Sequence, residues 1–195
     1  MNKPNMAETL RAEVAANDKR ERFDALPMLE VNSTEVRSLG HGQGFTKRTL
    51  EWLTKKGVFG DYHNADKEWD ITFNRTGARN VIGHDAGEGK IALLEHVPDL
   101  IENGIYLETV PQSKGLDSHI FAAKATIDGR SSVIGFVVRE DSNGKRYYDH
   151  AIRIESGDRA ETSLRATETT DGNLPENPNT LSNIVQKHLK VNSKT

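Results

Sequence analysis

The sequence contains no cysteine, and this absence excludes two kinds of protein. None of the 195 residues is cysteine, so neither a disulfide-bonded scaffold nor a thiolate metal site can form. Aromatic residues make up only 6% of the chain and the mean hydropathy is -0.66, which indicates that part of the chain contributes little to a core. The length permits one domain of ordinary size together with some loosely held chain.

Long apolar runs and an excess of positive charge are also missing. No run of about 18 apolar residues exists, so we predict no membrane span. The polar N-terminus lacks the apolar region of a secretory signal peptide, so we expect a cytoplasmic location in a bacterial host or target cell. A net charge of -3 argues against a protein that coats nucleic acid non-specifically, but it leaves room for a small cationic pocket.

The order of local patterns predicts an α+β fold, in which N-terminal helices precede an antiparallel β-sheet. Two helices are predicted, at 46–57 and 89–104, because apolar residues recur there near the helical period and each segment ends at a glycine. Pro98 is the point at which the second helix would break. Four later segments have the character of strands, and the turn sequences "DGR" and "DSNGK" join the last three as hairpins. These strands are predicted at 105–110, 119–128, 131–140 and 146–154.

Composition predicts four parts along the chain. A polar helical extension comes first, a compact α+β domain second, a flexible linker rich in Pro, Gly, Thr and Glu third, and a short capped helix last. The predicted boundaries are 1–25, 26–155, 156–180 and 181–190.

The stretch "KEWDITFNR" (67–75) predicts a strand that ends in an arginine. Its alternation places Trp69, Ile71, Phe73 and Arg75 on one face, which we expect to be buried. An arginine there needs a partner, either a buried carboxylate or a phosphate. The following segment, 76–84, is predicted to be a short helix or turn that Thr76 caps.

No familiar metal or nucleotide motif is present, so we predict no metal ion and no cofactor. The histidines are scattered without metal-ligand spacing, and the glycine-rich "GHGQG" lacks the lysine of a phosphate loop. What remains is histidine, arginine, lysine and tyrosine. These residue types suit RNA cleavage by attack of the ribose 2′-hydroxyl, because histidine transfers protons near neutral pH and arginine matches phosphate oxygens.

Four residues are candidate catalytic groups, namely Arg75, His84, Tyr148 and His150. His84 follows the Arg75 segment in "NRTGARNVIGHDAG", and it could equally cap the end of a helix. Tyr148 and His150, in "YYDH", are expected to share a strand face with the isoleucines that follow. That pair could face a cleft, or it could be a core histidine with a tyrosine hydroxyl as its partner.

Three further cations are candidate substrate-binding residues. Arg79 lies one turn after Arg75 if the segment is helical. Lys124 and Arg139 lie in neighbouring predicted strands and could line the same cleft. For all three, a solvated surface position is the alternative.

These residues resemble a known nuclease group. The order "LPMLEV", "EWDITFNRTGARNVIGH", "IALLEHVPDLIENGIYLETV" and "VVREDSNGKRYYDHAI" is similar to the phage-associated branch of the Barnase–EndoU–colicin–RelE-like nuclease superfamily and to related domains of large polyvalent proteins. The resemblance covers about residues 26–154. It implies an α+β fold and metal-independent RNase chemistry, with the matching polar positions at Arg75, Arg79, His84, Arg139, Tyr148 and His150.

Two classes of function are therefore expected. The leading one is a metal-independent ribonuclease of phage or mobile-element origin, a toxin or effector with RNA (tRNA among the expected targets) as its substrate and a cognate inhibitor as its partner. The other is a non-enzymatic protein-binding module that rides with mobile-element proteins and targets a host factor. A structural phage component is a third option.

Overall fold

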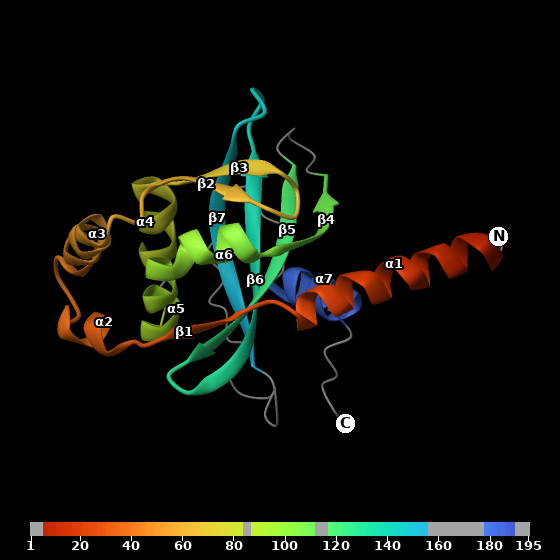
Figure 1. Ribbon diagram of the computed structural model, residues 1–195. Helices are drawn as coiled ribbons and strands as arrows, with labels where there is room; N and C mark the ends of the chain where they lie inside the picture. The colour runs from red at the N-terminus through yellow and green to blue at the C-terminus, as the bar shows by residue number, and fades with distance from the viewer. Residues whose placement is uncertain (1–5, 84–86, 112–116, 156–177, 190–195) are drawn as a thin grey trace.

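A single β-sheet organises the molecule, with helices on both of its faces (Figure 1). The computed structural model describes residues 6–83, 87–111, 117–155 and 178–189. Within these residues the sheet has seven strands. They are β1 (Met28–Val31), β2 (Gly60–Asn64), β3 (Trp69–Phe73), β4 (Ile105–Val110), β5 (Ser118–Ile127), β6 (Arg130–Glu140) and β7 (Arg146–Glu155).

The strand order is β1-β5-β6-β7-β3-β2, and β4 also pairs with β5. Strands β4 to β7 form an antiparallel meander, while β1 joins β5 and β3 joins β7 in parallel. Strand β5 is long enough to take β4 along its first half and β1 along its second half on the same edge. The predicted α+β fold is confirmed, and the structure adds the two parallel pairs and strand β2, which the sequence did not predict.

The central hairpin forms where the "DGR" turn predicts it. Asp128 and Gly129 have φ values of 48° and 78°, and a tight two-residue hairpin turn of this kind requires positive φ at both positions. Ten residue pairs then connect β5 to β6, from Ile127 and Arg130 down to Ser118 and Arg139.

One helix that the sequence predicts as continuous is divided into three helical segments in the structure. The helical segments are α1 (Met6–Asp24), α2 (Thr34–Ser38), α3 (Phe45–Lys56), α4 (Arg75–Gly83), α5 (Glu88–Ala92), the 3-10 helix η1 (Leu93–His96), α6 (Val97–Asn103) and α7 (Pro178–Leu189). The segment predicted as one helix over 89–104 is α5, η1 and α6, and Pro98 lies in the first turn of α6, where its missing N–H costs nothing. Gly104 ends α6 as predicted, and a Cβ there would lie 2.6 Å from the carbonyl oxygen of Leu100.

The two faces of the sheet carry separate apolar clusters. The first cluster unites the sheet with helices α2 to α6, and Phe73, Phe121 and Phe136 are its largest fully buried side chains. The second cluster unites the opposite face with α1 and α7. Gly135 permits α7 to approach closely, because a Cβ there would lie 2.8 Å from a methyl group of Val185.

Helix α1 extends away from the sheet (Figure 1), and its C-terminal end contributes a buried side chain. Phe23 belongs to the second cluster and is 6% exposed, whereas Val14 is 65% exposed. Helix α7 falls where the short C-terminal helix is predicted, but most of the predicted linker lies outside the described residues. The division into domains stays a prediction. Among the described helices, none is long and apolar enough to cross a membrane.

Candidate functional site

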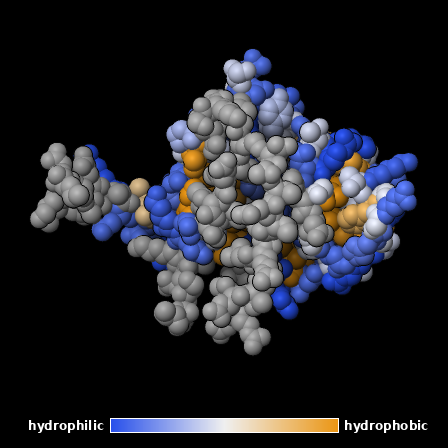
Figure 2. All heavy atoms as spheres, turned by 180° about the vertical axis from the view of Figure 1, so that it is seen from behind, coloured by the Kyte–Doolittle hydropathy of each residue, from blue (hydrophilic) through white to orange (hydrophobic). Residues whose placement is uncertain are grey.

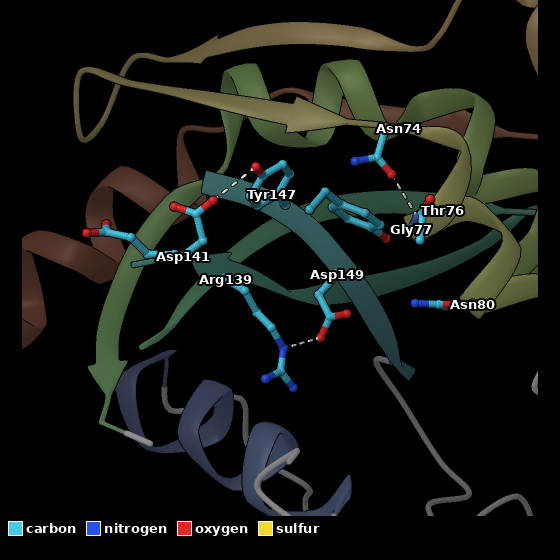
Figure 3. Close-up of a pocket in the computed structure, with 10 residues that line it drawn as sticks. Asn74, Thr76, Gly77, Asn80, Arg139, Asp141, Tyr147 and Asp149 are labelled. Atoms are coloured by element: carbon cyan, nitrogen blue, oxygen red, sulfur yellow. Dashed lines mark hydrogen bonds and ion pairs between the residues drawn. The ribbon is translucent and has the colours of Figure 1, made fainter. Parts of the chain in front are cut away.

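A pocket of about 240 Å³ opens between the first turns of α4 and the ends of β6 and β7 (Figure 3). Its helical side is formed by Asn74, Thr76, Gly77 and Asn80, and its sheet side by residues 139–141 and 147–149. The pocket exists because β3 pairs with β7 only at Arg146 and Tyr147. Beyond that point α4 takes the place of a strand beside β7.

A β-bulge at Asp149 determines which side chains of β7 lie together. Val138 pairs with Tyr148 and Val137 pairs with His150, so Asp149 is an extra residue with no partner of its own on β6. A bulge of this kind reverses the alternation of side chains along a strand. Tyr148 therefore packs in the first cluster, while Ile152, two residues after His150, packs against the second. The prediction that Tyr148 and His150 share a strand face is wrong, because strict alternation does not hold across the bulge.

Asp149 holds two of the predicted site residues. One of its carboxylate oxygens, Oδ2, accepts a hydrogen bond from Arg139 Nε at 2.8 Å and lies 3.1 Å from His150 Nδ1. The three side chains are only 19%, 24% and 25% exposed for Arg139, Asp149 and His150. Figure 3 shows Arg139 and Asp149 pointing toward one another from adjacent strands. We call these three residues the Asp149 triad.

The triad keeps Asp149 ionised. Burial by itself raises the pKa of Asp149, but the hydrogen bonds and charges of His150 and Arg139 outweigh it and bring the pKa to about 2. At neutral pH the carboxylate is charged and can accept a hydrogen bond from His150 Nδ1–H. In the tautomer that makes this bond, Nε2 is the acceptor nitrogen of the imidazole. Within the described residues, neither that Nε2 nor the terminal nitrogens of Arg139 make a hydrogen bond.

The remaining polar groups of the pocket maintain the local fold. Asp141 accepts hydrogen bonds from the backbone N–H groups of Asn143 and Lys145 and from the Tyr147 hydroxyl, which closes the β6–β7 turn. Burial and the Asp141 carboxylate raise the pKa of Tyr147. On the helical side, Asn74 Oδ1 accepts the N–H of Gly77 at 3.0 Å, so Asn74 caps α4, and the expected cap by Thr76 is wrong.

The structure places Arg75 and Arg79 outside the pocket. Strand β3 ends at Phe73, and it buries the side chains of Ile71 and Phe73 fully, as predicted. Arg75, however, is the first residue of α4 and is exposed, and its Nη1 donates to Thr54 Oγ1 at 2.9 Å. The predicted place of Arg75 on the buried aromatic face is wrong. Strand β3 ends at Phe73 and α4 begins at Arg75, so the alternation of the strand does not reach this residue. Arg79 is exposed on the same helix.

Two other predicted residues lie apart from the triad. Lys124 sits opposite Val133, near the far end of β6, where its ammonium group donates to the backbone oxygen of Asp24 at 2.7 Å. Tyr148 contributes its ring to the core, with Phe73 at a centroid distance of 5.3 Å, and burial raises the pKa of its hydroxyl. His84 lies outside the described residues, so its prediction stays untested.

Sequence reasoning missed Asp149, which organises the site. The signal was its place between a tyrosine and a histidine in "YYDH", since an aspartate beside a histidine is a common means of orienting an imidazole. The amides Asn74 and Asn80 were also missed, and nothing in the sequence around α4 distinguishes them from surface residues.

Other histidines of the described residues also contact polar side chains, and His63 and His119 are two of them. His63 Nδ1 lies 3.0 Å from Asp70, and its Nε2 lies 3.2 Å from Glu68, on the exposed β2–β3 hairpin. His119 is 6% exposed and lies between Thr109 and Glu140, and burial lowers its pKa. Among the described residues, no group of three or more histidine or carboxylate side chains could hold a metal ion.

The fold and the triad define a mixed α+β domain with a histidine–aspartate–arginine group at the edge of its sheet. Residues 43–148 match the model of the large polyvalent protein-associated domain 3, and the chain belongs to that family. The match includes Arg139 and all of α3 and α4, and it ends one residue before Asp149. No curated protein and no solved structure matches the chain.

Proposed function

We propose that this domain is a metal-independent ribonuclease of phage or mobile-element origin and that the Asp149 triad performs its chemistry. The observation that carries the proposal is the single carboxylate oxygen of Asp149, which lies within hydrogen-bond reach of both Arg139 Nε and His150 Nδ1. A histidine fixed in this manner is a general base, and a guanidinium beside it binds phosphate oxygens.

The proposed reaction is attack by the ribose 2′-hydroxyl on the adjacent phosphorus. His150 Nε2 takes the proton of the 2′-hydroxyl, the 2′-oxygen bonds to phosphorus, and the bond from phosphorus to the 5′-oxygen breaks. The terminal nitrogens of Arg139 stabilise the charge on the phosphorane oxygens. The leaving 5′-oxygen takes a proton from a second group, for which the sequence offers His84. The products are a 2′,3′-cyclic phosphate and a 5′-hydroxyl.

The helical wall of the pocket supports binding of an anion. Its residues Asn74, Thr76 and Gly77 belong to the start of α4, and a helix N-terminus favours negative charge. The first turn of α4 contains no acidic residue that would compete. A phosphate in the pocket would thus lie between the positive end of a helix and the Arg139 guanidinium.

The test is incubation of the purified protein with total RNA that includes tRNA, in EDTA. We expect discrete fragments with 2′,3′-cyclic phosphate and 5′-hydroxyl ends, and we expect His150→Ala to lower the rate about 100-fold or more, the usual contribution of a general base. His84→Ala tests the second proton transfer. Intact RNA in the presence of folded parent protein would reject the ribonuclease proposal.

A non-enzymatic binding module is the second candidate, and one observation favours it. The pocket is lined by three carboxylates, Glu140, Asp141 and Asp149, against one arginine. That balance suits a basic protein segment of a host factor better than an RNA phosphate. Intact RNA together with capture of a lysine- or arginine-rich peptide, reduced by Asp141→Asn, would support this candidate over the first.

A further inference from the structure

Helices α3 and α4 concentrate positive charge on a chain that is acidic overall. Helix α3 contains four basic residues and one acidic residue, and α4 contains two basic residues and no acidic one. The whole chain carries a net charge of -3. The two helices pack against each other, so this charge gathers at one end of the molecule (Figure 1). In the view from behind, that end lies at the right of Figure 2, where hydrophilic atoms border an apolar patch.

Half of these cations already have partners in the protein. The Arg48 guanidinium donates to backbone oxygens of Leu39, His41 and Gln43. Lys56 lies 2.8 Å from carboxylate oxygens of both Glu35 and Glu95. Lys47 lies 3.9 Å from Glu51 on the same helix.

The other three cations, Lys55, Arg75 and Arg79, are free of carboxylates, and we call them the α3–α4 ridge. All three are exposed. Over the part of the chain that the structure describes, no carboxylate oxygen lies within ion-pair distance of any of them. The hydrogen bond from Arg75 to Thr54 holds that guanidinium against the last turns of α3, to which Lys55 also belongs. Arg79 follows Arg75 by one helical turn on the same side of α4.

The ridge and the pocket occupy two sides of one helix. Thr76 and Asn80 face the pocket, while Arg75 turns toward α3. A polyanion that reached the pocket over the outer side of α4 would therefore meet the ridge first. Unpaired exposed cations with this spacing attract successive phosphates, because they lose little solvation and displace bound counterions from the polymer.

We infer that the α3–α4 ridge is an RNA-docking surface, separate from the triad, that grips the phosphate backbone of the substrate next to the pocket. The inference rests on the proposed ribonuclease function for its choice of RNA as the polyanion. The inference gives Arg75 a role in RNA binding instead of catalysis, and it adds Lys55 to the residues that bind RNA. It also explains how a chain with a negative net charge holds RNA, because the attraction is local.

The experiment measures binding apart from cleavage. Labelled tRNA is titrated in EDTA at a series of KCl concentrations with the His150→Ala protein, alone and combined with Arg75→Gln and Arg79→Gln. We expect the slope of log affinity against log salt to fall by about 2 in magnitude, roughly one for each phosphate that is no longer neutralised. The matched control combines Arg20→Gln with Arg130→Gln, two exposed arginines elsewhere, and we expect its slope to equal that of His150→Ala alone.

The outcomes separate this inference from the proposed function. Unchanged tRNA binding by the Arg75→Gln, Arg79→Gln protein overturns the ridge, even where the parent cleaves RNA and His150→Ala does not. A reduced salt slope supports the ridge, even where the parent cleaves nothing and the ribonuclease proposal falls. Tight binding of polyglutamate without measurable binding of tRNA overturns the ridge in favour of an acidic protein partner. Thermal unfolding of each variant verifies that the fold is intact.

Discussion

The histidine–aspartate pairs His63–Asp70 and His150–Asp149 differ in burial more than in geometry. The His63–Asp70 distance is 3.0 Å and the His150–Asp149 distance is 3.1 Å. Asp70 is 81% exposed and Asp149 is 24% exposed. The exposed pair sits on a hairpin with a second carboxylate, Glu68. The buried pair shares its carboxylate with Arg139, and Asp149 lines the pocket together with that arginine.

A short distance between imidazole and carboxylate is therefore not enough to define a catalytic site. At the surface, water screens the charges, and such a pair contributes little. Around Asp149 the reduced solvent strengthens each interaction and fixes the side chains, which is what proton transfer at a defined atom requires. The following predictions test this difference.

The largest expected difference is in stability after removal of the carboxylate. Asp149→Ala leaves Arg139 and His150 without their shared acceptor, so we expect it to lower the free energy of unfolding by about 3 kcal/mol. Asp70→Ala removes a surface partner and should cost about 0.5 kcal/mol or less. Urea unfolding followed by circular dichroism measures both. Equal losses would show that burial does not distinguish the pairs.

The pH dependence of stability should show the same contrast. The folded pKa of Asp149, about 2, lies below its ordinary value of 3.8, so its stabilisation is present above about pH 4 and is lost as the pH falls toward 2. This contribution is roughly 2 kcal/mol, since each pKa unit corresponds to about 1.4 kcal/mol. Asp149→Asn should flatten the acid limb of the stability curve, measured by urea unfolding at a series of pH values, and an unchanged acid limb would contradict the assigned contacts of Asp149.

A smaller effect is expected at His63. The hydrogen bond that Asp70 accepts from His63, and then the one that Glu68 accepts, raise the pKa of His63 above its ordinary 6.5. The stabilisation is therefore present below about pH 6.5 and disappears as the pH rises through the higher folded value. An NMR titration of the His63 ring should give a raised pKa that returns toward 6.5 in an Asp70→Asn, Glu68→Gln protein. An unchanged titration would contradict the assigned contacts.

The smallest effect is expected at Tyr148. Its ring packs between Phe73 and Phe136 in the first apolar cluster, and burial raises the pKa of its hydroxyl. Tyr148→Phe keeps the ring, so we expect cleavage within about two-fold of the parent and stability within about 1 kcal/mol. A loss of cleavage comparable to that of His150→Ala would restore Tyr148 as a catalytic group.

The sequence allowed most of the sheet to be predicted because its signals are local. Strands β4 to β7 alternate or run as apolar stretches, and turn sequences such as Asp128-Gly129 mark their ends. The candidate site was predictable only in part, because its decisive features are not local. The extra residue at Asp149 becomes a bulge only through the register with β6, and Arg75 leaves the buried face because α4 begins directly after β3. Neither event has a signature in the surrounding residues.

The most direct test of the central claim compares cleavage rates of three proteins on the same tRNA in EDTA. The parent and His63→Ala should cleave at rates within about two-fold of each other, because His63 lies on an exposed hairpin away from the pocket. His150→Ala should be slower by about 100-fold or more while it remains folded. Equal rates for His150→Ala and the parent would contradict the assignment of the chemistry to the Asp149 triad.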